Sequence, residues 1–128
     1  MLTVHFGLDG INMERKVFEN GYYLLTFYYP YDNEFDCYSC ENMEQVFQII
    51  TDKVKDELQY VRDMDSDFLE ELSERDEAIS LIHFIDSKEC ITNPTILESC
   101  FNLLLPDYCY GYRVVDGHGN VQFSFRCK

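Results

Sequence analysis

"NMEQVFQIITDKVKDELQYV", residues 42–61, contains the pattern that decides the fold class. Its apolar residues recur every three or four positions, and lysines and acids occupy many of the positions between them. These apolar residues are Met43, Val46, Phe47, Ile50, Val54, Leu58 and Val61. The period is typical of an amphipathic helix that buries one face. Asn42 and Gln45 are spaced to form a capping box at its start, so the sequence predicts a helix from about residue 42 to residue 61.

The segments on both sides of this helix have β character. Residues 1–6 alternate apolar and polar side chains, and Asn20-Gly21 separates two β-prone runs as a type I′ hairpin turn does. Residues 109–115 and 121–127 flank "DGHGN" and predict a C-terminal hairpin. Residues 31–40, "YDNEFDCYSC", are interpreted as an acidic, aromatic loop. "AISLIHFID", residues 78–86, is apolar on both faces and is interpreted as a central strand.

Two further helices are expected. Asn93 and Pro94 are placed as the cap and first turn of a helix that ends before Pro106. Residues 63–67, "DMDSD", should interrupt the first helix, and Asp67 with Glu70 should restart a second helix with its own cap. One long helix that continues through Met64, Phe68 and Leu72 stays open. The whole indicates a single acidic α+β domain covering residues 1–128. We expect an antiparallel or mixed sheet of about five or six strands, with N-terminal and C-terminal hairpins and two or three helices on one face.

The charge of the chain is unevenly distributed. Its 128 residues carry a net charge of −14 at pH 7, and residues 32–77 contain sixteen acids against four basic residues. Such a chain repels phosphates, so we expect neither direct nucleic-acid binding nor membrane binding, and a basic protein is the natural partner. No apolar run is long enough to span a bilayer and no signal peptide is recognised. We expect a cytoplasmic protein of a bacterial host cell or of a phage.

Motifs that carry chemistry are few. Cys37-Tyr-Ser-Cys40 comes shortly before a helix, where N–H groups can lower a thiol pKa, but Asp36 and Glu41 oppose a thiolate there. The other four cysteines stand singly, so no metal site is predicted. His83 is interpreted as a hydrogen-bonded core residue of the expected central strand. Because no phosphate-binding or nucleophile motif is present, we expect no enzyme activity and no cofactor.

"RDMDSDFLEELSERDE", residues 62–77, is the most distinctive surface candidate, with eight carboxylates and two arginines. On a helix, Phe68, Leu69 and Leu72 would form a stripe that ties it to a core. Carboxylates four residues apart would lie about 6 Å apart along the axis, a spacing comparable with that of phosphates along a strand. Acids here, with acids and tyrosines from residues 31–38, are the expected partner-binding residues. They are Asp63, Asp65, Asp67, Glu70, Glu71, Glu74, Glu77, Asp32, Glu34, Asp36, Tyr31 and Tyr38.

The leading hypothesis is therefore a small inhibitor that blocks a basic, nucleic-acid-binding enzyme by mimicking phosphates. An immunity protein for a nuclease toxin, or a phage protein against a nuclease-based defence such as CRISPR, would fit. Two alternatives stay open. One is a thiol-dependent redox protein that uses Cys37 and Cys40. The other is a non-catalytic adaptor whose acidity serves solubility. The partner and the oligomeric state are not specified by the sequence.

Overall fold

A computed structural model describes residues 2–6, 23–29, 34–105 and 110–126. Its elements are β1 (Leu2–Phe6), β2 (Tyr23–Tyr29), β3 (Glu34–Cys40), α2 (Met43–Met64), α3 (Ser66–Ser73), α4 (Asp76–Ser87), α5 (Pro94–Leu104), β4 (Gly111–Val115) and β5 (Val121–Arg126). The chain divides into two compact units, and the boundary falls inside α2. The first contains residues 1–46 and 107–128, and the second contains residues 47–106. The expectation of a single domain stays a prediction.

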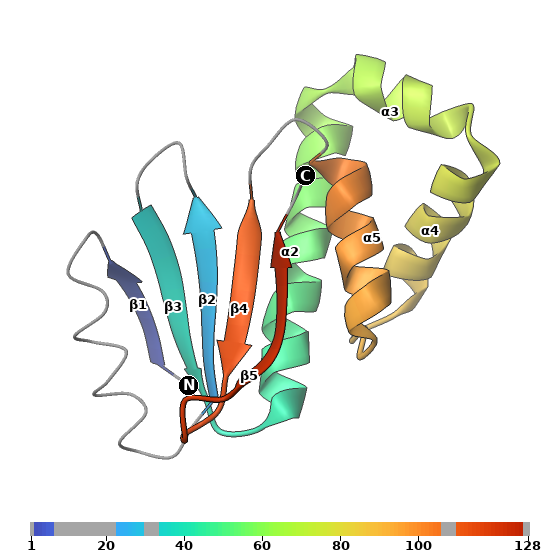
Figure 1. Cartoon of the computed structure of the whole chain (residues 1–128). Coiled ribbons are helices and arrows are strands. Elements are labelled where there is room, and N and C mark those ends of the chain that lie inside the picture. The colour runs from blue at the N-terminus through green and yellow to red at the C-terminus, as the bar shows by residue number, and fades with distance from the viewer. Residues whose placement is uncertain (1, 7–22, 30–33, 106–109, 127–128) are drawn as a thin grey trace. The chain divides into compact units, whose positions relative to one another are not determined.

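The first unit contains one antiparallel sheet with the strand order β1-β3-β2-β4-β5 (Figure 1). It has five strands among the described residues. The α+β class is thus confirmed, and every described pairing is antiparallel rather than mixed. The turn expected at Asn20-Gly21 lies outside the described residues.

Residues 34–40 correct one sequence interpretation, because they form β3 and not a loop. This strand pairs with β1 on one side and with β2 on the other. Ladder hydrogen bonds to two neighbours outweigh the low β propensity of acidic residues. On β2, the four consecutive residues from Leu24 to Phe27 are fully buried, so this strand is covered on both faces along that stretch. The ring of Phe27 packs against those of Tyr38, Tyr110 and Tyr112 at centroid distances of 5.7–5.8 Å.

The C-terminal hairpin is confirmed. β4 and β5 are joined by a turn in which Asp116 accepts two backbone N–H bonds through its side chain, and Gly119 adopts a φ of 82°. A register shift between Val114 and Val115 places Val121 opposite Val115, so Val121 does not share the face of the next apolar residues of β5. Val121 is 56% exposed.

The second unit is helical, and four helices lie among the described residues, where two or three were expected. The additional helix is α4, which corrects the interpretation of residues 78–86 as a strand. The same apolar run has a helical period: Ala78 and Ile85 are buried, whereas Ser80, His83 and Asp86 are exposed. A short apolar run fits either structure, and here the helical period prevails.

The helix starts follow the capping signals in the sequence. Asn42 accepts the N–H of Gln45 at 2.9 Å, and the Gln45 side chain accepts the N–H of Glu41 at 2.9 Å. Asn93 accepts two N–H groups at the start of α5, with Pro94 in the first turn. These residues satisfy N–H groups that have no partner inside the helix. The predicted interruption after residue 62 is also confirmed, because α2 ends at Met64.

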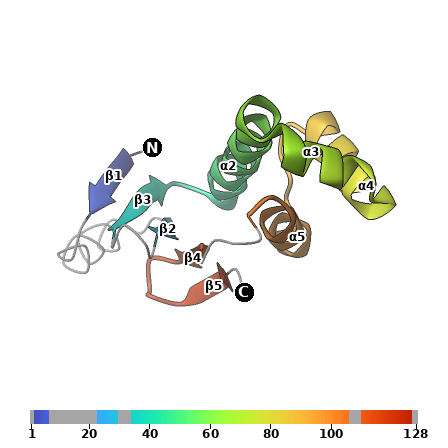
Figure 2. The ribbon, with the colours of Figure 1, turned by 90° about the horizontal axis from the view of Figure 1, so that it is seen from above.

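Buried contacts and polar pairs join the helices of this unit. Ile50, Val54, Leu58 and Val61 of α2 are buried, as are Leu97, Cys100, Phe101 and Leu104 of α5. The Thr51 hydroxyl accepts the N–H of Ile91 at 2.9 Å, which ties α2 to the segment after α4. Figures 1 and 2 both show α3 running from the end of α2 toward the start of α4. Residues 62–77 therefore form one continuous stretch of the helical unit, from the end of α2 through α3 to the start of α4.

Candidate protein-binding surface

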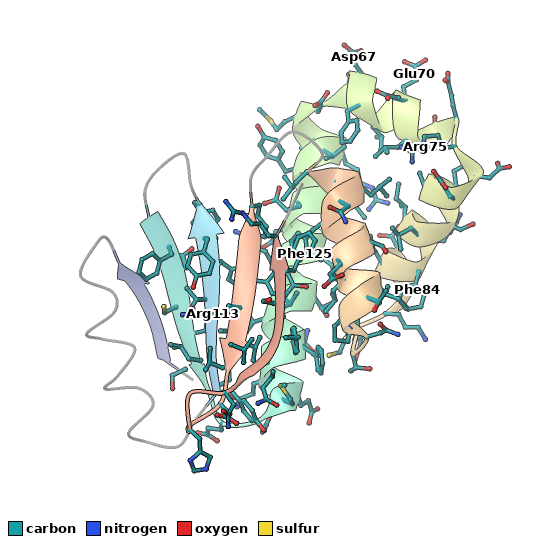
Figure 3. The ribbon with its side chains drawn as sticks, viewed as in Figure 1. Asp67, Glu70, Arg75, Phe84, Arg113 and Phe125 are labelled. Carbon is teal, nitrogen blue, oxygen red and sulfur yellow. The ribbon has the colours of Figure 1, made fainter. Side chains whose placement is uncertain are left out.

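Residues 62–77, called the acidic segment below, form an ordered and exposed surface of the helical unit. They cover the end of α2, all of α3 and the first turn of α4. All eight carboxylates of the segment are exposed. In Figure 3, Asp67 and Glu70 point away from α3 and from the other helices of the unit. Residues 47–106 contain fourteen acids and five basic residues, a net charge of −9, so this unit carries most of the negative charge.

Two local contacts give α3 its structure. The Asp65 side chain accepts the N–H of Phe68 at 3.2 Å, and this cap lies two residues before the expected one, Asp67. Leu72 is fully buried, whereas Phe68 and Leu69 are half-buried, so the expected apolar stripe exists and Leu72 is its innermost residue. The remaining residues of α3 are exposed. The acidic segment is therefore a helical surface and not an acidic tail.

The two arginines of the segment leave most of its carboxylates without ion-pair partners. Arg62 donates two hydrogen bonds to Asp86 of α4, at 3.1 and 2.7 Å, and Arg75 pairs with Glu77 at 2.6 Å. The bond from Arg62 holds the pKa of Asp86 below its ordinary value. Seven carboxylates of the segment form no ion pair with any residue that the structure describes. They are Asp63, Asp65, Asp67, Glu70, Glu71, Glu74 and Asp76.

The remaining expected binding residues belong to the sheet unit. Asp36 and Tyr38 lie on β3 with half-buried side chains, and the Tyr38 ring packs edge-on against Phe27. Glu34 is the first residue of β3. Tyr31 and Asp32 lie outside the described residues. The packing of Tyr38 against Phe27 is enough to explain an aromatic residue at this position, with no need for a binding partner. A binding role for Tyr31, Asp32, Glu34, Asp36 and Tyr38 stays a prediction.

The geometry of Cys37 and Cys40 opposes the redox alternative. Residues three apart on a strand point to opposite faces, and at about 3.3 Å per residue their Cα atoms lie roughly 10 Å apart. A disulfide requires Cα atoms within about 7 Å. The Cys40 thiol is free, and burial raises its pKa to about 11. The Cys37 thiol lies 3.4 Å from the hydroxyl of Thr26, its register partner on β2.

The two histidines whose side chains the structure describes both lie at exposed positions. His83 is exposed on α4, so the prediction of a core histidine is wrong, and His118 is exposed in the hairpin turn. No cluster of three or more potential metal ligands occurs among the described residues. Nor is any described helix long and apolar enough to cross a membrane.

Tyr60 and Met64 are exposed apolar residues that the sequence reasoning missed. Tyr60 is 60% exposed and Met64 is 70% exposed, near the C-terminal end of α2. Tyr60 lies outside the predicted apolar stripe through Val54, Leu58 and Val61. This position in the sequence indicates that its side chain is exposed. In the alternative of one long helix, Met64 would continue that stripe, and its exposure contradicts this alternative.

Comparison of the chain with protein-family models, with curated proteins and with solved structures finds no match.

Proposed function

We propose that the protein binds the basic, nucleic-acid-binding surface of another protein and thereby excludes nucleic acid from it. One observation carries this proposal. Seven exposed carboxylates of the acidic segment lie on ordered helices or at their caps and have no ion-pair partner among the described residues. Like charges this close repel one another in the free protein. A basic partner relieves that repulsion, and its own lysines and arginines gain the contacts that phosphates otherwise supply.

The inhibition would be competitive. Carboxylates of the acidic segment occupy positions on the partner that bind phosphates, so the inhibitor and the nucleic acid cannot bind together. Long-range attraction between opposite charges accelerates the encounter and makes it sensitive to salt. A nuclease is the partner class that we favour, with the chain acting as an immunity protein or as a phage anti-defence protein. The proposal requires no catalytic group or cofactor of the chain itself.

A charge-reversal variant tests the proposal on a partner isolated from the organism that encodes the chain. The immobilised protein retains its partner from a nuclease-treated lysate, and the purified partner is then titrated with a labelled nucleic acid that it binds. We expect wild-type chain to displace the nucleic acid. E70K/E71K/E74K should do so at least about tenfold less well, with a weaker dependence on salt.

A matched control separates the position of the charges from the total charge. D52K/E89K/E98K changes the net charge by the same amount within the same unit but outside the acidic segment. It should displace nucleic acid almost as well as wild type. The proposal fails if both triple variants lose the same activity, or if the partner binds nucleic acid and the chain simultaneously.

A further inference from the structure

The exposed pair Tyr60 and Met64 lies on a face of α2 separate from the one that packs into the helical unit. Residues four apart on a helix are neighbours on the same face, about 6 Å apart along the axis. The buried residues Leu58 and Val61 point toward another side of the helix. With Val121 of the sheet unit, these two residues are the exposed large hydrophobic side chains of the described chain. Isolated exposed apolar residues are common, but a tyrosine and a methionine one helical turn apart are close enough for one partner segment to contact both.

Carboxylates border this apolar pair on the same helix. Asp56 and Asp63 are four residues before and three residues after Tyr60, which puts both on its face, and both are exposed. Asp63 also accepts a hydrogen bond from the exposed side chain of Gln59 at 2.9 Å. The pair therefore has an apolar centre and an anionic rim, and the acidic segment continues directly from it. Aromatic and methionine side chains inside a polar rim are typical of the centre of a protein interface.

We propose that Tyr60 and Met64 form the apolar anchor for a cationic segment of the partner protein, a segment that carries an apolar side chain between its lysines and arginines. The charge of the rim determines this choice of occupant. Asp56 and Asp63 would repel an anionic apolar segment and would not attract a neutral one. A cationic segment forms ion pairs with them. The inference rests on the proposed function and adds to it a chemical requirement that a phosphate backbone cannot meet, namely an apolar side chain.

Two synthetic peptides of equal charge test the anchor without the natural partner. One is an 18-residue amphipathic helix of lysine and leucine, and the other carries the same lysines with serine in place of leucine. Binding is measured by calorimetry, and protein labelled with ¹³C-methyl methionine reports on Met64 by NMR. We expect wild type to bind the leucine peptide at least about tenfold more tightly, with a shift of the Met64 methyl signal.

The variants make failure of the anchor distinguishable from failure of the charged surface. Y60A/M64A should remove the preference for leucine and leave binding of the serine peptide unchanged, whereas V121A, which truncates the exposed apolar residue of the other unit, should keep the preference. E70K/E71K/E74K should weaken both peptides. If Y60A/M64A keeps the leucine preference, the anchor is refuted. If the charge-reversal variant binds both peptides as wild type does, the charged surface is refuted instead.

Discussion

Truncation of Leu72 should unfold α3 without removing any charge of the acidic segment. Leu72 is the fully buried residue of α3, and the other residues of this helix are exposed or half-buried. Leu72→Ala removes three carbon atoms, worth about 2.4 kcal/mol at about 0.8 kcal/mol for each buried methylene. A cavity adds to this cost where the surroundings do not collapse, so we expect a loss of about 3 kcal/mol. An eight-residue helix is shorter than the roughly 12–15 residues that a helix needs to be stable alone, so α3 should lose its structure.

Hydrogen exchange and urea unfolding measure the two parts of this prediction. Amide protons of α3 should exchange close to the rate of an unfolded chain in Leu72→Ala, while those in the middle of α2 keep their protection. Leu69→Ala is the matched control, because the same change at a half-buried position of the same helix should cost about 1 kcal/mol. Equal protection of α3 in both variants would refute the conclusion that Leu72 holds this helix in place.

Four other residues give sharper local tests. Asp65→Ala removes the N-cap acceptor of α3 and should cost about 1 kcal/mol in urea unfolding, with no such loss for Asp65→Asn. Asp86 has a pKa below its ordinary 3.8, so its contribution to stability is present above that value and lost as the pH falls through the lower, folded-state pKa. Asp86→Asn should remove this pH dependence. Gly111→Ala would place a Cβ 2.8 Å from the carbonyl oxygen of Phe125 and should lower stability by about 1–3 kcal/mol in thermal unfolding. Cys40, buried and with a pKa near 11, should resist alkylation at pH 8 until denaturant is added, and rapid labelling of the native protein would contradict its burial.

The features that sequence reasoning predicted correctly are those specified by local chemistry. The caps at Asn42 and Asn93 and the C-terminal hairpin depend on residues within a few positions of one another, and the structure has all three. β3 was missed because its acidic residues have low β propensity and because its pairing with β1 joins segments far apart in the sequence, such as Phe6 and Phe35. α4 was missed because an apolar run of nine residues fits both a buried strand and a helix.

The candidate site shows the same division between local and distant information. The composition of the sequence predicted the acids of the acidic segment, and the helical period predicted its apolar stripe through Leu72. Both features can be found from neighbouring residues alone. The pairing of Arg62 could not be predicted, because Asp86 is 24 residues away and was expected to end a strand. The exposure of Tyr60 was predictable from its position outside the apolar stripe, whereas its residue type gave no signal, because tyrosine is intermediate between the buried and exposed residue types.

The pairing of Arg62 bears directly on why the acidic segment can be both ordered and negatively charged. An arginine within a group of carboxylates would ordinarily form an ion pair with a neighbouring one. Asp63 and Asp65 are the acids of the segment closest to Arg62 in the sequence. Here the guanidinium binds Asp86, which lies outside the segment, so the bond joins α2 to α4 and leaves Asp63 and Asp65 without an ion pair among the described residues. Fixed carboxylates lose less conformational entropy on binding than mobile ones, and unpaired carboxylates need not first break an ion pair. This contact therefore adds to the order that the Asp65 cap and the buried Leu72 give the segment, and it does so without pairing Asp63 or Asp65. Arg62→Gln should consequently reduce partner binding through loss of order, even though it makes the surface more negative.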